Sequence, residues 1–130
     1  MKIDRNDLIG AWRLHDYILV DADGHQHRPF REDSTGLLFY TSNGYMSVAT
    51  MQINAETSEA TFLSYHGTFD LYDNRMVHHI EISSDAELVG RDNVRYLALD
   101  GETLTLTARP SLFGGEGTEA EIIWRRAQRS

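Results

Sequence analysis

The 130-residue chain contains no cysteine and only two prolines. Without cysteine it cannot form a disulfide, a thiolate zinc site or a cysteine nucleophile. No apolar run approaches the roughly 20 residues that a membrane span requires. The charged segment at residues 1–7 also lacks the apolar stretch of a signal peptide. We therefore expect a cytoplasmic protein.

Basic residues are scarce, with 12 Lys and Arg against 20 Asp and Glu, which gives a formal net charge of −8. An anionic surface repels phosphate backbones and anionic lipids, so we expect neither nucleic acid nor a membrane as partner. The composition, 41% hydrophobic and 25% charged, is typical of globular proteins. The length fits one domain, over residues 1–130.

The pattern of turns predicts an all-β protein, because turn dipeptides separate short runs of β-branched, aromatic and aliphatic residues. Two short segments, Asp4–Ile9 and Glu56–Phe62, have helical character, and Asp4 would cap the first. Evenly spaced hairpins favour a single antiparallel up-and-down barrel of eight to nine strands with a short N-terminal helical turn, because closure removes exposed edges. The strands are expected at about 10–20, 25–30, 36–41, 45–53, 62–72, 76–84, 92–99, 103–109 and 119–127.

A two-residue turn at Asp73-Asn74 sets the register of one predicted hairpin. Phe69 then pairs with His78, and Tyr65 pairs with Ile82. His78 is the only strongly polar group on the face that this register turns inward. The inner face comprises Tyr65, Gly67, Phe69, Leu71, Met76, His78, Ile80 and Ile82. The outer face includes His66, His79 and Glu81, with His66 opposite Glu81.

A second two-residue turn, at Asp100-Gly101, pairs Leu97 with Leu104 and Arg95 with Leu106. Arg95 thereby points inward among leucines, where its permanent charge requires an anionic or carbonyl partner. That partner is either a molecule inside the barrel or an interior acid, and Asp16 is the nearest acid by strand parity. A third hairpin, at Asn43-Gly44, gives no clear register and leaves the directions of Tyr40 and Tyr45 open.

We expect no metal site and no cofactor, because the remaining histidine and glycine patterns do not match known binding motifs. His25 and His27 have the spacing of two ligands on one strand face, but a transition-metal site needs three or four ligands. The glycine-rich segment 111–117 lacks the lysine and helix of a phosphate loop. We expect it to form a hairpin loop, or a lid, at the barrel mouth.

Short motifs in the same order along most of the chain carry a resemblance to a known family. Gly10-Ala11-Trp12 matches the Gly-x-Trp of the first strand of lipocalin-type barrels, and the chain most resembles the lipocalin-like domain proteins of bacteria and fungi. The sequence departs from their pattern at His66, where an aromatic residue is expected, and at Arg31, where glycine is expected. The matching segments are Leu8–Leu14, Asp21–Gly24, Gly36–Thr41, Asn43–Ser47, Tyr65–Phe69, Val77–Glu81, Val89–Arg95 and Trp124–Arg126.

The resemblance implies a small barrel with an internal cavity, closed at one end where Arg126 or Arg125 stacks on Trp12. It also implies either a carrier or a cofactor-free enzyme of a natural-product pathway that isomerises or cyclises a reactive intermediate. Such an analogy of fold does not by itself assign a function.

We hypothesise that the barrel binds a small, largely apolar molecule and acts as a cofactor-independent isomerase or cyclase. His78 would shuttle a proton, and Arg95 and Tyr65 would hold an oxygen of the substrate. The alternatives are a carrier that uses the same residues for affinity, and an interaction protein that uses its acidic surface. His78 could equally be a core histidine satisfied by Tyr65 or by a backbone carbonyl. The sequence leaves open the ligand and the choice between monomer and homodimer. The remaining predicted ligand contacts are Phe69, Ile80, Leu97, Leu104, Leu106 and Tyr40.

Overall fold

The computed structural model describes residues 3–109 and 117–129 of the chain. Its two helical elements are single 3-10 turns, and every other regular element is a β-strand. The elements in chain order are η1 (Arg5–Asp7), β1 (Gly10–Val20), β2 (Gln26–His27), β3 (Thr35–Tyr40), β4 (Tyr45–Ile53), β5 (Ala60–Tyr72), β6 (Arg75–Ser83), η2 (Ala86–Leu88), β7 (Asp92–Asp100), β8 (Thr103–Ala108) and β9 (Glu119–Arg126).

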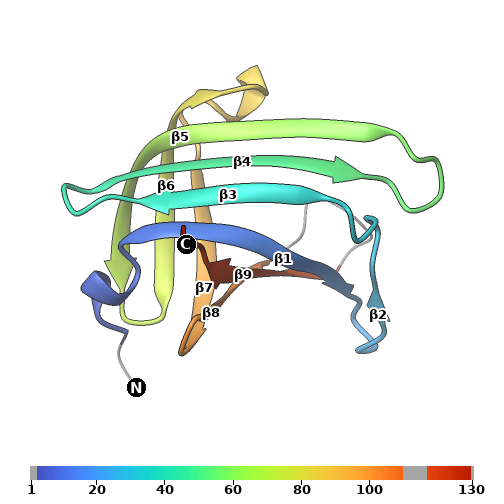
Figure 1. Cartoon of the computed structure of the whole chain (residues 1–130), viewed down its shortest axis with the longest axis horizontal. Helices are drawn as coiled ribbons and strands as arrows, with labels where there is room; N and C mark the ends of the chain where they lie inside the picture. The colour runs from blue at the N-terminus through green and yellow to red at the C-terminus, as the bar shows by residue number, and fades with distance from the viewer. Residues whose placement is uncertain (1–2, 110–116, 130) are drawn as a thin grey trace.

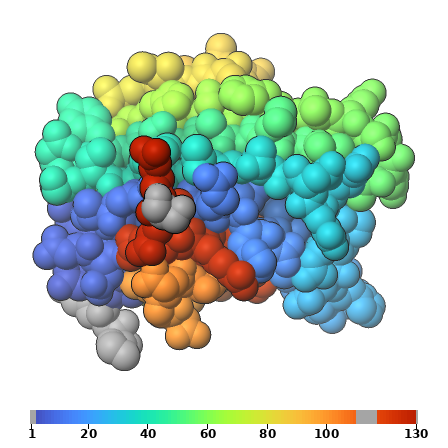
Figure 2. Space-filling model, viewed as in Figure 1, coloured from blue at the N-terminus to red at the C-terminus, as the bar shows by residue number. Residues whose placement is uncertain are grey.

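The strands form one antiparallel sheet in the order β2-β1-β3-β4-β5-β6-β7-β8-β9, and β9 pairs back with β1. That pairing closes an eight-stranded barrel from β1 and β3–β9, with β2 as an extra strand beside β1. In Figure 1, β3, β4 and β5 run side by side across the molecule, and β1 and β9 lie below them. The C-terminal residues lie against the first strand in Figure 2. The predicted all-β barrel is confirmed.

The N-terminal end of the barrel is closed around Trp12. Asp4 caps η1 by accepting the N–H of Asn6, as predicted. Trp12 is fully buried and donates its indole N–H to the carbonyl of Leu8 at 2.9 Å. The guanidinium carbon of Arg126 lies 4.1 Å from the centre of the Trp12 ring. The stacking arginine is thus Arg126, the first of the two candidates, and its cation–π contact joins the last strand to the first.

Two predicted elements differ in the structure. The predicted helix Glu56–Phe62 is wrong. Residues 55–57 form a turn, in which the side chain of Asn54 accepts the backbone N–H groups of Glu56 and Thr57, and residues 60–62 begin β5. The predicted strand at 25–30 shrinks to Gln26–His27, since Pro29 has no N–H with which to continue a ladder. The 3-10 turn η2, capped by Asp85, was not predicted.

A β-bulge in β1 overturns the expected direction of Asp16. The register shifts between Leu14 and Asp16, so the residues after the bulge change faces. Asp16 consequently lies outside, where Arg28 binds its carboxylate at 3.0 and 3.1 Å. Of the two alternatives for the partner of Arg95, an interior pair with Asp16 is therefore wrong.

A second bulge, between His66 and Gly67, corrects the end of the β5–β6 hairpin. From the turn to the pair of Gly67 with Ile80 the predicted register holds. Beyond it, Tyr65 pairs with Ser83 and not with Ile82, and Ile82 turns outward with 66% of its surface exposed. His66 consequently lies opposite Ile82 and not opposite Glu81.

The close approach at this bulge requires glycine. A Cβ at Gly67 would lie 1.8 Å from the backbone oxygen of His79, far inside van der Waals contact. The two strands can therefore come together here only because residue 67 has no side chain.

The β7–β8 hairpin has the predicted faces but a different register. Leu97 pairs with Leu106, and Leu99 pairs with Leu104. Each predicted partner is thus wrong by two residues, because the turn lies one residue further along than expected. A shift of two residues preserves the side-chain alternation, so Arg95 still faces inward.

The third hairpin resolves the two tyrosines whose directions were open. Tyr40 pairs with Met46 and is 1% exposed, whereas Tyr45 is 53% exposed. Gly44 adopts a left-handed conformation (φ 93°) in the connecting loop, as such loops require.

The predicted loop at 111–117 lies outside the described residues, except for Gly117. Pro110 also lies outside them. Within residues 3–109 and 117–129, no helix is long and apolar enough to cross a membrane.

Candidate functional site

A cavity of about 80 Å³ lies inside the barrel. Of the predicted site residues, Tyr65, His78, Arg95 and Leu106 line it. The other predicted ligand contacts are buried in the core away from its wall: Tyr40, Phe69, Ile80, Leu97 and Leu104. The full lining is Tyr17, Leu38, Val48, Thr50, Gln52, Leu63, Tyr65, His78, Arg95, Leu106, Ile122 and Trp124.

His78 is held between two tyrosine hydroxyls. Its Nε2 lies 2.7 Å from the Tyr40 hydroxyl, and its Nδ1 lies 2.9 Å from the Tyr65 hydroxyl. His78 is 1% exposed. Burial, with the positive charges of Arg95 and His79, lowers the pKa of His78 to about 3. The imidazole is therefore neutral at physiological pH.

The tautomer of His78 decides which of the two tyrosine hydroxyls donates to it. A neutral imidazole has one N–H donor and one acceptor nitrogen, so one hydroxyl donates to it and the other accepts from it. Burial raises the pKa of Tyr40 well above its usual value, so this hydroxyl keeps its proton. In either tautomer, one hydroxyl donates to His78, and the other accepts from it and keeps its own O–H free. Tyr65 lines the cavity, so in the tautomer with the proton on Nδ1 its O–H can donate to a molecule there.

Arg95 brings a permanent positive charge to the cavity wall. Its Nη1 donates to the carbonyl of Val94 at 3.0 Å. Arg95 forms no ion pair with any carboxylate in the described part of the chain. The guanidinium therefore retains donors that a molecule in the cavity can take.

Four polar lining residues were not identified from the sequence: Tyr17, Thr50, Gln52 and Trp124. Gln52 is 7% exposed and Trp124 is 2% exposed. Alternation along β9 (Ala120, Ile122, Trp124) would have placed Trp124 inside. Gln52 could have been placed only by a correct register for the β3–β4 hairpin.

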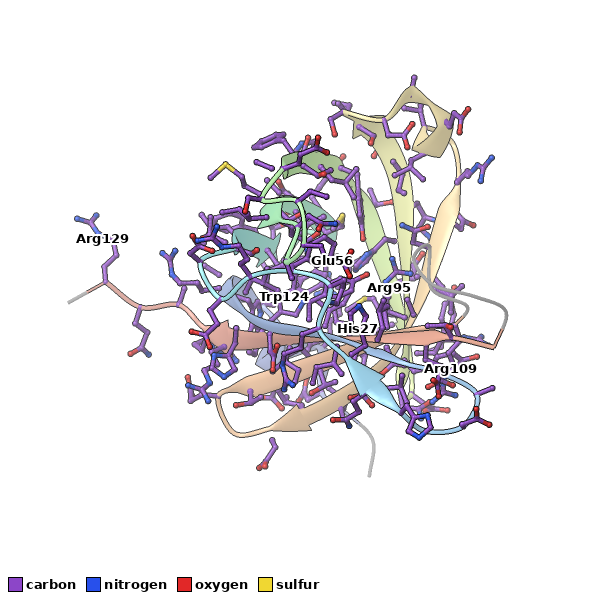
Figure 3. The ribbon with its side chains drawn as sticks, turned by 90° about the vertical axis from the view of Figure 1, so that its right-hand side faces the viewer. His27, Glu56, Arg95, Arg109, Trp124 and Arg129 are labelled. Carbon is purple, nitrogen blue, oxygen red and sulfur yellow. The ribbon has the colours of Figure 1, made fainter. Side chains whose placement is uncertain are left out.

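The cavity adjoins a surface groove of about 590 Å³. Tyr17 and Gln52 line both spaces, so these two side chains lie at the boundary between them. Figure 3 views the molecule from the right-hand side of Figure 1, and Arg95 and Trp124 lie toward the middle of that view with strands around them. The groove is lined by Leu14, His15, Asp16, Tyr17, Arg28, Phe30, Arg31, Glu32, Ser34 and Gln52.

His79 lies on the outer face, as predicted. Its two ring nitrogens each lie 2.8 Å from a carboxylate, Nδ1 from Asp92 and Nε2 from Asp70. The hydrogen bond to Asp92 raises the pKa of His79 above its usual value, and the hydrogen bond to Asp70 raises it further, by a smaller amount. The folded protein thus favours the imidazolium form.

Replacing His79 with Gln should therefore destabilise the protein in a pH-dependent way. A raised folded-state pKa contributes stability below the unfolded pKa of about 6.5, and this contribution disappears as pH rises through the folded value. We expect H79Q to lower the melting temperature by a few degrees at pH 5.5 and much less at pH 9. The matched control is H27Q, because His27 is exposed and forms no ion pair with a described residue. H27Q should leave the melting temperature unchanged at both pH values. Equal losses for H79Q at both pH values would contradict this assignment.

The two histidines near β2 are solvent-exposed. His25 Nδ1 lies 3.6 Å from a carboxylate oxygen of Asp21. The other Asp21 oxygen accepts the backbone N–H groups of Asp23 and His25. Asp21 thus holds the turn before β2 through these two hydrogen bonds, which is a common structural role for aspartate.

Comparison with known proteins agrees with the barrel geometry. A family model described as a lipocalin-like domain matches residues 9–127. A crystal structure of a lipocalin-like protein from Bacteroides uniformis superposes with a TM-score of 0.54 at 17% sequence identity. The alignment covers 93% of this chain and 99% of that one, and at this identity the likeness shows the fold alone. No curated protein matches the sequence.

Proposed function

The chain belongs to the lipocalin-like domain family, and from this premise we propose that it binds a small, largely apolar molecule inside its barrel. The observation that supports this is the interior cavity, where an apolar wall meets a few polar side chains. Small-molecule sites in proteins have this mixed character. The apolar wall comprises Leu38, Val48, Leu63, Leu106 and Ile122.

The size of the cavity limits what it can enclose. Sites for drug-sized ligands span about 300–1,000 Å³, whereas this cavity measures about 80 Å³. Only a small molecule, or the polar head of a longer one, fits within it. A longer molecule would extend past Tyr17 and Gln52 into the adjoining groove.

Narrowing the cavity should weaken binding. Leu63 is a partly buried lining residue, so we expect L63F to raise the Kd of a bound apolar molecule roughly tenfold, as one misplaced group in a pocket commonly does. Two-dimensional ¹⁵N NMR titration with straight-chain alcohols and acids would measure this change. The neighbouring Phe62 is 64% exposed, so F62L is the matched control and should leave affinity unchanged. Equal effects of the two variants would place the ligand outside the barrel.

We further propose that the protein catalyses a cofactor-independent isomerisation or cyclisation, as an enzyme of a natural-product pathway. The side chains of Arg95 and Tyr65 support this proposal because donors beside a cavity stabilise the negative charge that develops on a carbonyl oxygen. His78, with a pKa of about 3, is too weak a base to hold a proton at neutral pH. Its role would be to hold the Tyr65 hydroxyl in place, and the proton that leaves the substrate carbon would go to water. A carrier would use the same groups for affinity alone.

Exchange of substrate hydrogens with solvent distinguishes the enzyme proposal from the carrier proposal. Stabilisation of an enolate accelerates exchange of the hydrogens on the carbon next to a ketone. We expect the protein to increase the rate at which cyclohexanone takes up deuterium in D₂O, as measured by NMR. The variant Y65F should lose this increase, and Y45F, which alters an exposed tyrosine, should not. A bound ketone with no exchange above the buffer rate would leave only the carrier proposal.

A further inference from the structure

Two of the polar side chains around the cavity, Arg95 and Trp124, can only donate hydrogen bonds. Arg95 donates one N–H to the carbonyl of Val94 and forms no ion pair with a carboxylate among the described residues. No Asp or Glu is among the described residues that line the cavity. The site thus presents positive charge and donors to its contents, although the whole chain carries a net charge of −8.

Trp124 provides the most specific observation. Its indole Nε1 is buried and has no hydrogen-bond acceptor among the described residues. Such a group costs free energy unless it is satisfied, and unsatisfied buried donors are rare in native proteins. By contrast, Trp12 at the closed end donates to the carbonyl of Leu8. An acceptor for Trp124 is therefore expected from the contents of the cavity.

Gln52 places an amide group at the boundary of the cavity, and its side chain is 7% exposed. It lines both the cavity and the surface groove. A polar molecule that enters from the groove would thus pass Gln52 before it reaches Trp124 and Arg95.

We propose that the ligand is a small carboxylic acid, bound as its carboxylate between the Arg95 guanidinium and the Trp124 indole N–H. This inference rests on the proposed binding function and specifies its chemical class. A carboxylate accepts several hydrogen bonds and pairs well with a guanidinium. Its three heavy atoms fit the small cavity, and its apolar chain then contacts Leu63 and Ile122 or extends into the groove.

The test compares molecules that differ only in the head group. Hexanoate, hexanamide and 1-hexanol would be titrated into the full-length protein at pH 7.5 and followed by ¹⁵N NMR. We expect hexanoate to bind at least about tenfold more tightly than either neutral analogue, because hydrogen bonds to charged groups are the stronger ones. In the wild-type protein, the Trp124 indole N–H signal should shift downfield with hexanoate and not with 1-hexanol. The Trp12 indole signal should not move.

A variant tests the same contact. W124F should reduce the preference for hexanoate over 1-hexanol about tenfold, whereas W12F should leave this preference unchanged even where it lowers the melting temperature. The indole shift needs no substitution and remains decisive if W124F does not fold. Neutral analogues that bind as tightly as hexanoate, or an unmoved Trp124 signal, would overturn the inference and leave the proposed binding function standing. No binding by any of the three molecules would instead count against both.

Discussion

Replacing Arg95 with Met should weaken binding of a small carboxylate about 100-fold without lowering the melting temperature. The loss of affinity follows because the guanidinium supplies charge-assisted hydrogen bonds worth about 1.5–3 kcal/mol each. The melting temperature should not fall because Arg95 has no acidic partner among the described residues. Removing an unpaired, partly buried charge is neutral or stabilising. Calorimetric titration with hexanoate and thermal unfolding would measure the two effects.

Arg75 is the matched control for this substitution. It lies exposed on β6, with its guanidinium carbon 5.5 Å from the centre of the Tyr72 ring, so R75M makes the same change of charge away from the cavity. R75M should leave the affinity for hexanoate unchanged. R95M should also raise the pKa of His78, because the Arg95 charge contributes to lowering it. A loss of affinity in R75M as large as in R95M would show that the overall charge, and not the cavity, determines binding.

Replacing His78 with Phe should destabilise the protein by about 2–6 kcal/mol. The substitution leaves the hydroxyls of Tyr40 and Tyr65 without their histidine partner, and each unsatisfied buried group costs about 1–3 kcal/mol. Folded domains are stable by only about 5–15 kcal/mol, so a large share of the total would be lost. Urea denaturation, analysed at constant m-value, would measure the change.

A double substitution separates the hydrogen bonds from packing. In H78F with Y40F, the orphaned hydroxyl of Tyr40 is also removed, so the double variant should be more stable than the sum of the two single effects predicts. Replacing both partners of a buried hydrogen bond by apolar groups costs less than replacing one. Y45F, which alters an exposed tyrosine, is the control and should be additive with H78F. Additive losses for H78F and Y40F would contradict the assigned network.

The local alternation of side chains explains how much of the site could be predicted. On β5 and β6 the predicted inward residues from Gly67 to Ile80 were correct, because apolar residues alternate with polar ones along each strand and so mark the inner face. His78 and Arg95 were placed inside by this reasoning alone. The correct face survived even where the turn between β7 and β8 was placed one residue too early, because the resulting error was an even number of residues.

The bulges show where alternation fails. An extra residue in β1 turned Asp16 outward to Arg28, and another in the β5–β6 pair turned Ile82 outward. A bulge follows from the twist and curvature that barrel closure imposes. These demands arise from the whole sheet, so a single strand's sequence does not reveal them.

The sequence by itself determined the all-β class, the strand boundaries to within about two residues for all but β2, and the inward direction of His78 and Arg95. These properties depend on turn chemistry and on alternation between neighbouring residues. Only the tertiary structure decided that Tyr40 and Tyr65 hold the two nitrogens of His78, and that Trp124 and Gln52 share a cavity with Arg95. The physical reason is that β3, β4, β5, β6, β7 and β9 supply these side chains from distant parts of the chain, and pairing of β9 with β1 closes the barrel around them. The volume of the cavity, and so the size of what it can enclose, follows from how all these side chains pack together.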